Sequence, residues 1–158
     1  MKLSENFSLQ EFTKSQTALR LGIDNTPEGE HLEAAQALFE NVVQPVRDFF
    51  GPTVINSGYR GPELNEAVGG STKSQHTKGQ AVDIEVPGTA NAEVAEWIAE
   101  NLDVDQLILE FAEEDDPAAG WVHVSYRDDG ENRNQYLTAA RDPETRKVNY
   151  YSGIGVYS

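Results

Sequence analysis

The sequence predicts an α+β fold, a single domain in which a mainly antiparallel sheet is flanked by helices. Three observations predict it: helical patterns of apolar residues come first, period-two segments with one long helix among them follow, and no linker or repeat interrupts the chain. The chain has 158 residues, 38% of them hydrophobic, which suits one domain with its own core. We expect a helical lead-in over 1–51, a core over 53–126 and C-terminal strands or a tail over 127–158.

Helices dominate the expected lead-in. Ser8 and Glu11 have the spacing of a capping box, so a short helix should begin at Leu9. A longer helix should begin at Thr26-Pro27, where a capping residue precedes a proline, and should be bent or divided near Pro45. Its apolar residues recur at three- and four-residue steps: Leu32, Ala35, Leu38, Val42, Val46 and Phe49.

Short strands and two more helices fill the rest of the chain. We expect helices over 63–68 and 92–102, separated by a polar, glycine-rich loop over 69–80. The alternation of apolar and polar residues predicts strands over 54–57, 81–86, 106–111 and 121–126, the last two antiparallel, and a weaker hairpin of 136–140 with 147–151.

Composition excludes several classes of function. The 27 acidic and 12 basic residues give a net charge of -15, which disfavours nucleic acid or an anionic membrane as a partner. There is no cysteine, so a metal must be bound by His, Asp or Glu. No apolar stretch approaches the roughly 20 residues of a membrane span, and the first residues lack a signal-peptide pattern. We expect a monomer made in the cytoplasm.

Polar residues of three predicted strands point to a shared sheet face. In each strand the apolar neighbours turn Asp83, Glu110 and His123 away from the core by period-two alternation. A second histidine, His76, lies in the loop just before the Asp83 strand, whereas His31 lies on the long helix and is expected to be a surface residue.

Two imidazoles and one carboxylate, with a fourth position left for water, are the ligand set of a catalytic zinc. Zinc lowers the pKa of bound water to about 7, which makes water attack on a carbonyl feasible near neutrality. Glu110 is the best local candidate to carry the proton, since its strand should adjoin that of His123. Arg60, at a strand end, is placed to stabilise the developing oxyanion.

The segment 74–83, Ser-Gln-His-Thr-Lys-Gly-Gln-Ala-Val-Asp, resembles the S-x-H-x-x-G-x-A-x-D motif of the zinc D-alanyl-D-alanine metallopeptidases. The segments 57–60 and 121–125 resemble the other two blocks of this family, in the form of its phage-associated carboxypeptidase and endolysin branch. The helical segment 7–51 is also similar to that branch, so the resemblance covers roughly 7–126. It implies a fold like that of DD-peptidases and hedgehog signalling domains.

The resemblance implies that His76, Asp83 and His123 are zinc ligands and that Arg60 binds the substrate carbonyl. It also implies that Ser74 lies beside the metal site and hydrogen-bonds the substrate or a ligand. One departure concerns the general base, because many relatives carry an acidic residue or histidine shortly before the last ligand. Here those positions are Ala118, Ala119, Gly120 and Trp121. Glu110 is therefore our candidate base, with Asp115 and Asp116 as poorer ones. Tyr59 and Trp121 are candidates to line the substrate groove.

Two functions are compatible with these residues. The first is a zinc peptidase that hydrolyses a peptidoglycan stem peptide, at the terminal D-Ala-D-Ala bond or at an internal L-Ala-D-Glu bond. It would act on the cell wall, as a phage lysin or a virion component. The alternative is a non-catalytic, zinc-containing binding module of the same fold, which the missing acidic residue before His123 favours.

Overall fold

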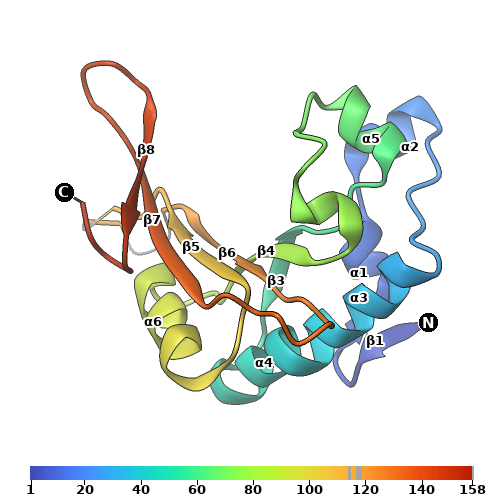
Figure 1. Cartoon of the computed structure of the whole chain (residues 1–158), viewed down its shortest axis with the longest axis horizontal. Coiled ribbons are helices and arrows are strands. Elements are labelled where there is room, and N and C mark those ends of the chain that lie inside the picture. The colour runs from blue at the N-terminus through green and yellow to red at the C-terminus, as the bar shows by residue number, and fades with distance from the viewer. Residues whose placement is uncertain (114, 117–118, 158) are drawn as a thin grey trace.

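The computed structural model describes residues 1–113, 115–116 and 119–157 (Figure 1). It confirms the α+β class, with a six-stranded, mostly antiparallel sheet and helices packed against it. The strand order is β3-β4-β6-β5-β7-β8. The strand bounds are β3 Val54–Ser57, β4 Ala81–Glu85, β5 Gln106–Glu110, β6 Trp121–Ser125, β7 Gln135–Arg141 and β8 Val148–Ser152.

The pairing of the strands confirms two expectations and adds one feature. β5 and β6 are antiparallel, and β7 and β8 form the expected hairpin. The addition is that β7 pairs with β5 in parallel, on the edge that β6 leaves free. The backbone N–H groups of Asn134 and Gln135 donate to the carbonyls of Val104 and Asp105, which starts this ladder. The C-terminal hairpin is thereby joined to the central sheet.

The first helix begins where the capping box predicts. Ser8 Oγ accepts from the backbone N–H of Glu11 at 3.3 Å, and Glu11 Oε1 accepts from the N–H of Ser8 at 3.1 Å. This box opens α1 (Leu9–Thr13), which follows the small β1–β2 hairpin (Lys2–Ser4, Phe7–Ser8) and precedes α2 (Gln16–Leu21). A capping box satisfies two N–H groups that the helix leaves without a partner.

The long helix differs from the prediction at its start. α3 (Glu30–Leu38) begins after Gly29, not at Thr26-Pro27. Asp24 Oδ1 accepts the N–H of Thr26, which holds a turn there, and Gly29 adopts a positive φ of 54° before the first helical residue. These local turns compete with a helix start at proline.

The expected division near Pro45 is present as one turn of π-helix, η1 (Phe39–Val43), followed by α4 (Gln44–Phe50). Proline has no N–H and its ring clashes with the carbonyl four residues earlier, so the regular α pattern cannot continue through it.

The remaining helices are α5 (Pro62–Ala67) and α6 (Asn91–Asn101), both near their expected positions. The polar segment 69–80 is not wholly loop, because a short 3-10 helix, η2 (Gln75–Lys78), ends it. Ser74 caps η2 by accepting the N–H of His76 at 3.2 Å, a local bond that composition alone did not reveal.

One hydrophobic core lies between the sheet and the helices, and α6 packs against β5 and β6 beneath the sheet (Figure 1). The core face of the three central strands is fully buried, at Val82, Ile84, Leu107, Leu109, Val122 and Val124. The opposite face is therefore free to carry polar side chains.

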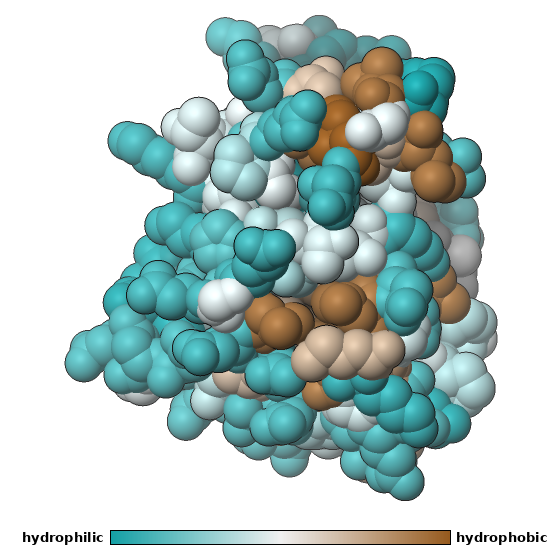
Figure 2. Space-filling model, turned by 90° about the vertical axis from the view of Figure 1, so that its right-hand side faces the viewer, coloured by the Kyte–Doolittle hydropathy of each residue, from teal (hydrophilic) through white to brown (hydrophobic). Residues whose placement is uncertain are grey.

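The surface reflects the composition. On the face that carries α2 and α5, Figure 2 shows mostly hydrophilic residues, with one group of hydrophobic residues near these two helices and a second group lower on the same face. The exposed apolar side chains of this region are Leu19, Leu21 and Val68. Among the helices of the described residues, none has the length and apolar character needed to cross a bilayer.

Candidate metal centre

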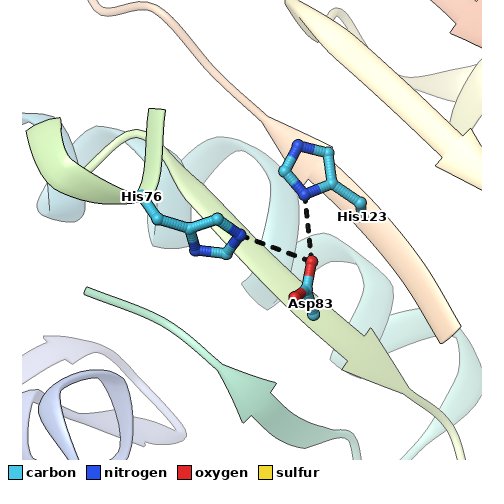
Figure 3. A group of neighbouring side chains, drawn as sticks. All are labelled: His76, Asp83 and His123. Carbon is cyan, nitrogen blue, oxygen red and sulfur yellow. Dashed lines mark hydrogen bonds and ion pairs between the residues drawn. The ribbon is translucent and has the colours of Figure 1, made fainter. Parts of the chain in front are cut away.

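Three side chains from separate elements converge above the sheet: His76 from η2, Asp83 from β4 and His123 from β6 (Figure 3). Their candidate ligand atoms all lie within 4.8 Å of one another. Asp83 and His123 are directly opposite each other in the antiparallel β4–β6 register. The predicted face-sharing of these two residues is therefore a direct cross-strand contact.

A hydrogen bond on the side of the ring away from Asp83 fixes the orientation of His76. Its Nδ1 lies 2.8 Å from the carbonyl oxygen of Gly58, an acceptor, so Nδ1 carries the proton and donates it. Nε2 faces Asp83 Oδ1 at 3.5 Å, where it can donate to the carboxylate when it carries a proton and can bind a metal when it does not. The ring is only 5% exposed. A backbone carbonyl on the far nitrogen is the usual support of a metal-binding histidine.

His123 approaches the same carboxylate oxygen from the other side. Its Nδ1 lies 2.9 Å from Asp83 Oδ1. Ligand bonds of about 2.0–2.1 Å in a tetrahedral zinc site separate neighbouring donor atoms by about 3.3 Å. The observed separations of 3.5 Å and 2.9 Å bracket that value. Two of the three separations are thus close to those of a zinc site, and all the candidate ligand atoms lie within 4.8 Å, so the three residues could hold a zinc ion.

The charge of Asp83 suits a cation. Burial alone would raise its pKa, but hydrogen bonds from His123 and His76 outweigh burial and lower the pKa to about 2. The carboxylate is therefore ionised at neutral pH and ready to bind a metal.

The metal cluster opens into a cavity of about 840 Å³. Arg60, Ser74 and Glu110 line this cavity together with the three metal-binding candidates. Arg60 Nη2 lies 3.5 Å from Ser74 Oγ, and the backbone N–H of Arg60 donates to the carbonyl of His76 at 3.1 Å. Arg60 Nε is buried and has no hydrogen-bond partner among the described residues.

Glu110 is next to the cluster on the same sheet face. In the β5–β6 register Ile108 lies opposite His123 and Glu110 lies opposite Trp121. Burial raises the pKa of Glu110, and the neighbouring His123 counteracts this only in part. A carboxyl group with a raised pKa is suited to accepting and returning a proton near neutrality.

The other candidate carboxylates lie elsewhere. Asp115 and Asp116 are exposed and are not among the described residues that line the cavity. Ala118, one of the positions at which relatives carry a base, lies outside the described residues.

The two aromatic candidates do not line the cavity. Tyr59 is 5% exposed, and its hydroxyl lies 2.9 Å from His31 Nδ1. His31 is thereby half-buried, a correction to the expected surface position. Trp121 is half-buried beside Glu110, with its ring edge-on to Phe111 at 5.4 Å.

Several cavity residues were not foreseen from the sequence: Gln75, Asp105, Ile108, Arg127, Arg133 and Tyr150. Arg127 and Arg133 come from the segment between β6 and β7, and Tyr150 on β8 lies at the cavity through the pairing of β7 with β5 and with β8.

Two histidines and a carboxylate converging in an open, polar cavity define a metallopeptidase type of site. The family model described as Peptidase M15 matches residues 5–125, so the chain belongs to the M15 peptidases, a zinc-dependent family. The comparison with curated proteins gave no match. The resemblance stated from the sequence motifs is thereby confirmed at the level of the family.

Proposed function

We propose that this protein hydrolyses an amide bond of a peptidoglycan stem peptide, with His76, Asp83 and His123 as the ligands of one zinc ion. The observation that carries the proposal is that the metal cluster, Arg60 and Glu110 line one cavity. A metal site, an oxyanion donor and a proton carrier are the three parts that metal-assisted amide hydrolysis requires.

Arg60 binds and polarises the carbonyl of the scissile bond. Its guanidinium lines the cavity beside Ser74, and the terminal N–H groups that Ser74 does not accept can donate to a substrate oxygen. A fixed donor aimed at an oxygen that gains negative charge stabilises the transition state more than the ground state. Ser74 Oγ helps to hold Arg60 and can bond to the substrate itself.

Glu110 is the general base. It takes a proton from the attacking water and returns a proton to the departing amine, so one water is added across the C–N bond. When bound, the zinc ion supplies polarisation of the water and of the carbonyl. Trp121 borders Glu110 and keeps water from one of its sides, whereas Tyr59 acts indirectly by packing beneath the segment that carries Arg60.

The bond cleaved is either the terminal D-Ala-D-Ala bond or an internal bond of the L-Ala-D-Glu type. The cell wall is then the place of action, and a phage lysin or virion component is the setting that the phage-like motifs favour. We expect the working unit to be a monomer, since all the proposed site residues come from one chain.

The test is digestion of purified peptidoglycan by zinc-loaded protein, with mass spectrometry of the soluble muropeptides. Loss of one D-Ala identifies carboxypeptidase activity, whereas new N-terminal Glu-containing fragments identify an endopeptidase. We expect Glu110→Gln to retain zinc and to lose activity by about a hundredfold or more. Glu85→Gln, which changes a carboxylate on β4 outside the cavity, is the control and should keep its activity.

Zinc binding at one ion per chain without cleavage of any wall peptide would establish the alternative, a non-catalytic binding module. Unchanged activity of Glu110→Gln would instead remove only the assignment of the base. Glu110 in the cavity favours the enzyme, because a binding module needs no proton carrier beside the metal.

A further inference from the structure

The cavity has a charge balance opposite to that of the chain. Among the described residues, five of the twelve Lys and Arg line it, namely Arg60, Lys73, Lys78, Arg127 and Arg133, but only four of the 27 Asp and Glu do. A bound zinc ion would add further positive charge. A cationic cavity in a protein of net charge -15 attracts an anionic ligand to this one place.

Arg133 is the best anchored of these cations. Its Nε and Nη2 donate to the two oxygens of Asp105 at 3.1 and 3.0 Å, and its backbone N–H donates to the same carboxylate at 3.1 Å. The side chain of Asp105 is 2% exposed, whereas that of Arg133 is 52% exposed. Two of the five guanidinium N–H groups are used by Asp105, so three are left for a ligand.

The same carboxylate connects this arginine to the metal loop. Gln75 Nε2 donates to Asp105 Oδ2 at 2.9 Å, and Gln75 is the residue before the metal-binding candidate His76. Asp105 therefore fixes both Arg133 and one side of the metal loop. Burial opposes ionisation of Asp105, but the bonds from Arg133 lower its pKa, so the pair stays charged.

Arg127 and Tyr150 complete this side of the cavity, which we call the C-terminal wall (Arg127, Arg133 and Tyr150). Arg127 pairs with Asp129 at 2.6 Å, and Tyr150 is 57% exposed. Tyr150 reaches the cavity through a cross-strand row in which Glu110 lies opposite Ala139 and Ala139 lies opposite Tyr150. The C-terminal wall lies beyond residue 125, where the family match ends.

We propose that Arg133, positioned by Asp105, binds a free carboxylate of the peptide substrate and so makes the protein selective for acidic over amidated stem peptides. The proposal rests on the proposed function for its substrate class. A stem peptide offers two such carboxylates, the α-carboxylate of its D-Glu residue and its C-terminus. A guanidinium fork with fixed orientation suits a planar carboxylate, because charge-assisted bonds are directional.

The experiment compares four synthetic stem pentapeptides: both carboxylates free, D-Glu amidated, C-terminus amidated, and both amidated. We expect one single amidation to lower kcat/KM by about tenfold or more, mainly through KM, and this peptide identifies the carboxylate that is bound. Arg133→Gln should cleave the peptide with both carboxylates free and this singly amidated peptide with kcat/KM values within about twofold of each other. Its zinc content should be unchanged.

Two further variants guard against misfolding and against a general charge effect. Arg133→Gln leaves the buried Asp105 without its partner, so the double variant Asp105→Asn with Arg133→Gln removes both charges together. The double variant should also lose the preference for the free-acid peptide. Lys147→Gln removes one positive charge from the same C-terminal segment, outside the cavity, and this variant should keep the preference for the free-acid peptide.

Equal rates on all four peptides, or a preference that survives in the double variant, would overturn the proposal. If no peptide is cleaved, the proposed function fails. The carboxylate-binding role of Arg133 is then tested separately, by calorimetric measurement of peptide binding. Zinc-loaded protein should then bind the free-acid pentapeptide about tenfold more tightly than its doubly amidated form, and the double variant should bind both alike. Equal affinities in the unaltered protein would reject the subsite.

Discussion

The two sides of the cavity are built in different ways. On the metal side, His76 is 5% exposed and its far nitrogen is bonded to a backbone carbonyl, that of Gly58. On the C-terminal wall, Arg133 is half-exposed and is held by another side chain, that of Asp105. Backbone support and burial suit ligands that must not move, whereas an exposed guanidinium can meet substrates that differ in shape.

This difference predicts which side of the cavity should tolerate substitutions. Damage to the metal side should abolish zinc binding and activity together, because the two histidine nitrogens face the same carboxylate oxygen, Asp83 Oδ1. Damage to the C-terminal wall should alter selectivity and leave the metal in place. Four predictions test this contrast.

The largest effect is expected from His123→Ala. It removes one of three ligands, so zinc content should fall to a small fraction and activity by more than about a thousandfold. Zinc is measured by mass spectrometry of the dialysed protein. His31→Ala, the remaining histidine, should retain one zinc per chain. Full zinc content in His123→Ala would contradict the ligand assignment.

Gly58→Ala tests the backbone support of His76. An added Cβ would lie 2.2 Å from the carbonyl oxygen of Phe12, so the strand end must shift, at a cost of about 1–3 kcal/mol in the free energy of unfolding. The shift moves the carbonyl that orients His76, and zinc affinity should fall about 10–100-fold. Gly61→Ala, whose Cβ would meet its nearest atom at 3.4 Å, is the control. Equal zinc affinity in both variants would show that the Gly58 carbonyl is dispensable.

The third prediction concerns acid stability of the zinc-free protein. Because the pKa of Asp83 is about 2 when folded and 3.8 ordinarily, ionised Asp83 stabilises the fold above pH 3.8, and this stabilisation is lost as the pH falls toward 2. It amounts to about 2 kcal/mol. Urea unfolding of Asp83→Asn should therefore show a smaller loss of stability between about pH 6 and about pH 2 than the unaltered protein. The same loss of stability in both proteins would show that the fold does not lower the pKa of Asp83.

The smallest effect on stability is expected from Arg127→Gln on the C-terminal wall. Its ion pair with Asp129 is exposed and screened by solvent, so Tm and zinc content should not change measurably. Differential scanning fluorimetry and zinc analysis check this outcome. A loss of zinc here would show that the two sides of the cavity are not independent.

Several features followed from the sequence alone. The capping box at Ser8 placed the first helix at Leu9, and Pro45 marked the division of the long helix. Period-two alternation placed Asp83, Glu110 and His123 on one sheet face, and the 74–83 motif indicated the family that residues 5–125 match. These signals are local, because each depends on side chains a few positions apart.

Other features were decided only by the tertiary structure. The parallel pairing of β7 with β5 depends on which sheet edge is free. The contact of Asp105 with Arg133 joins residues 28 positions apart, and no sequence pattern in either segment predicts it. The sequence by itself therefore indicated the candidate metal ligands, whereas long-range contacts decided which cations lie beside them.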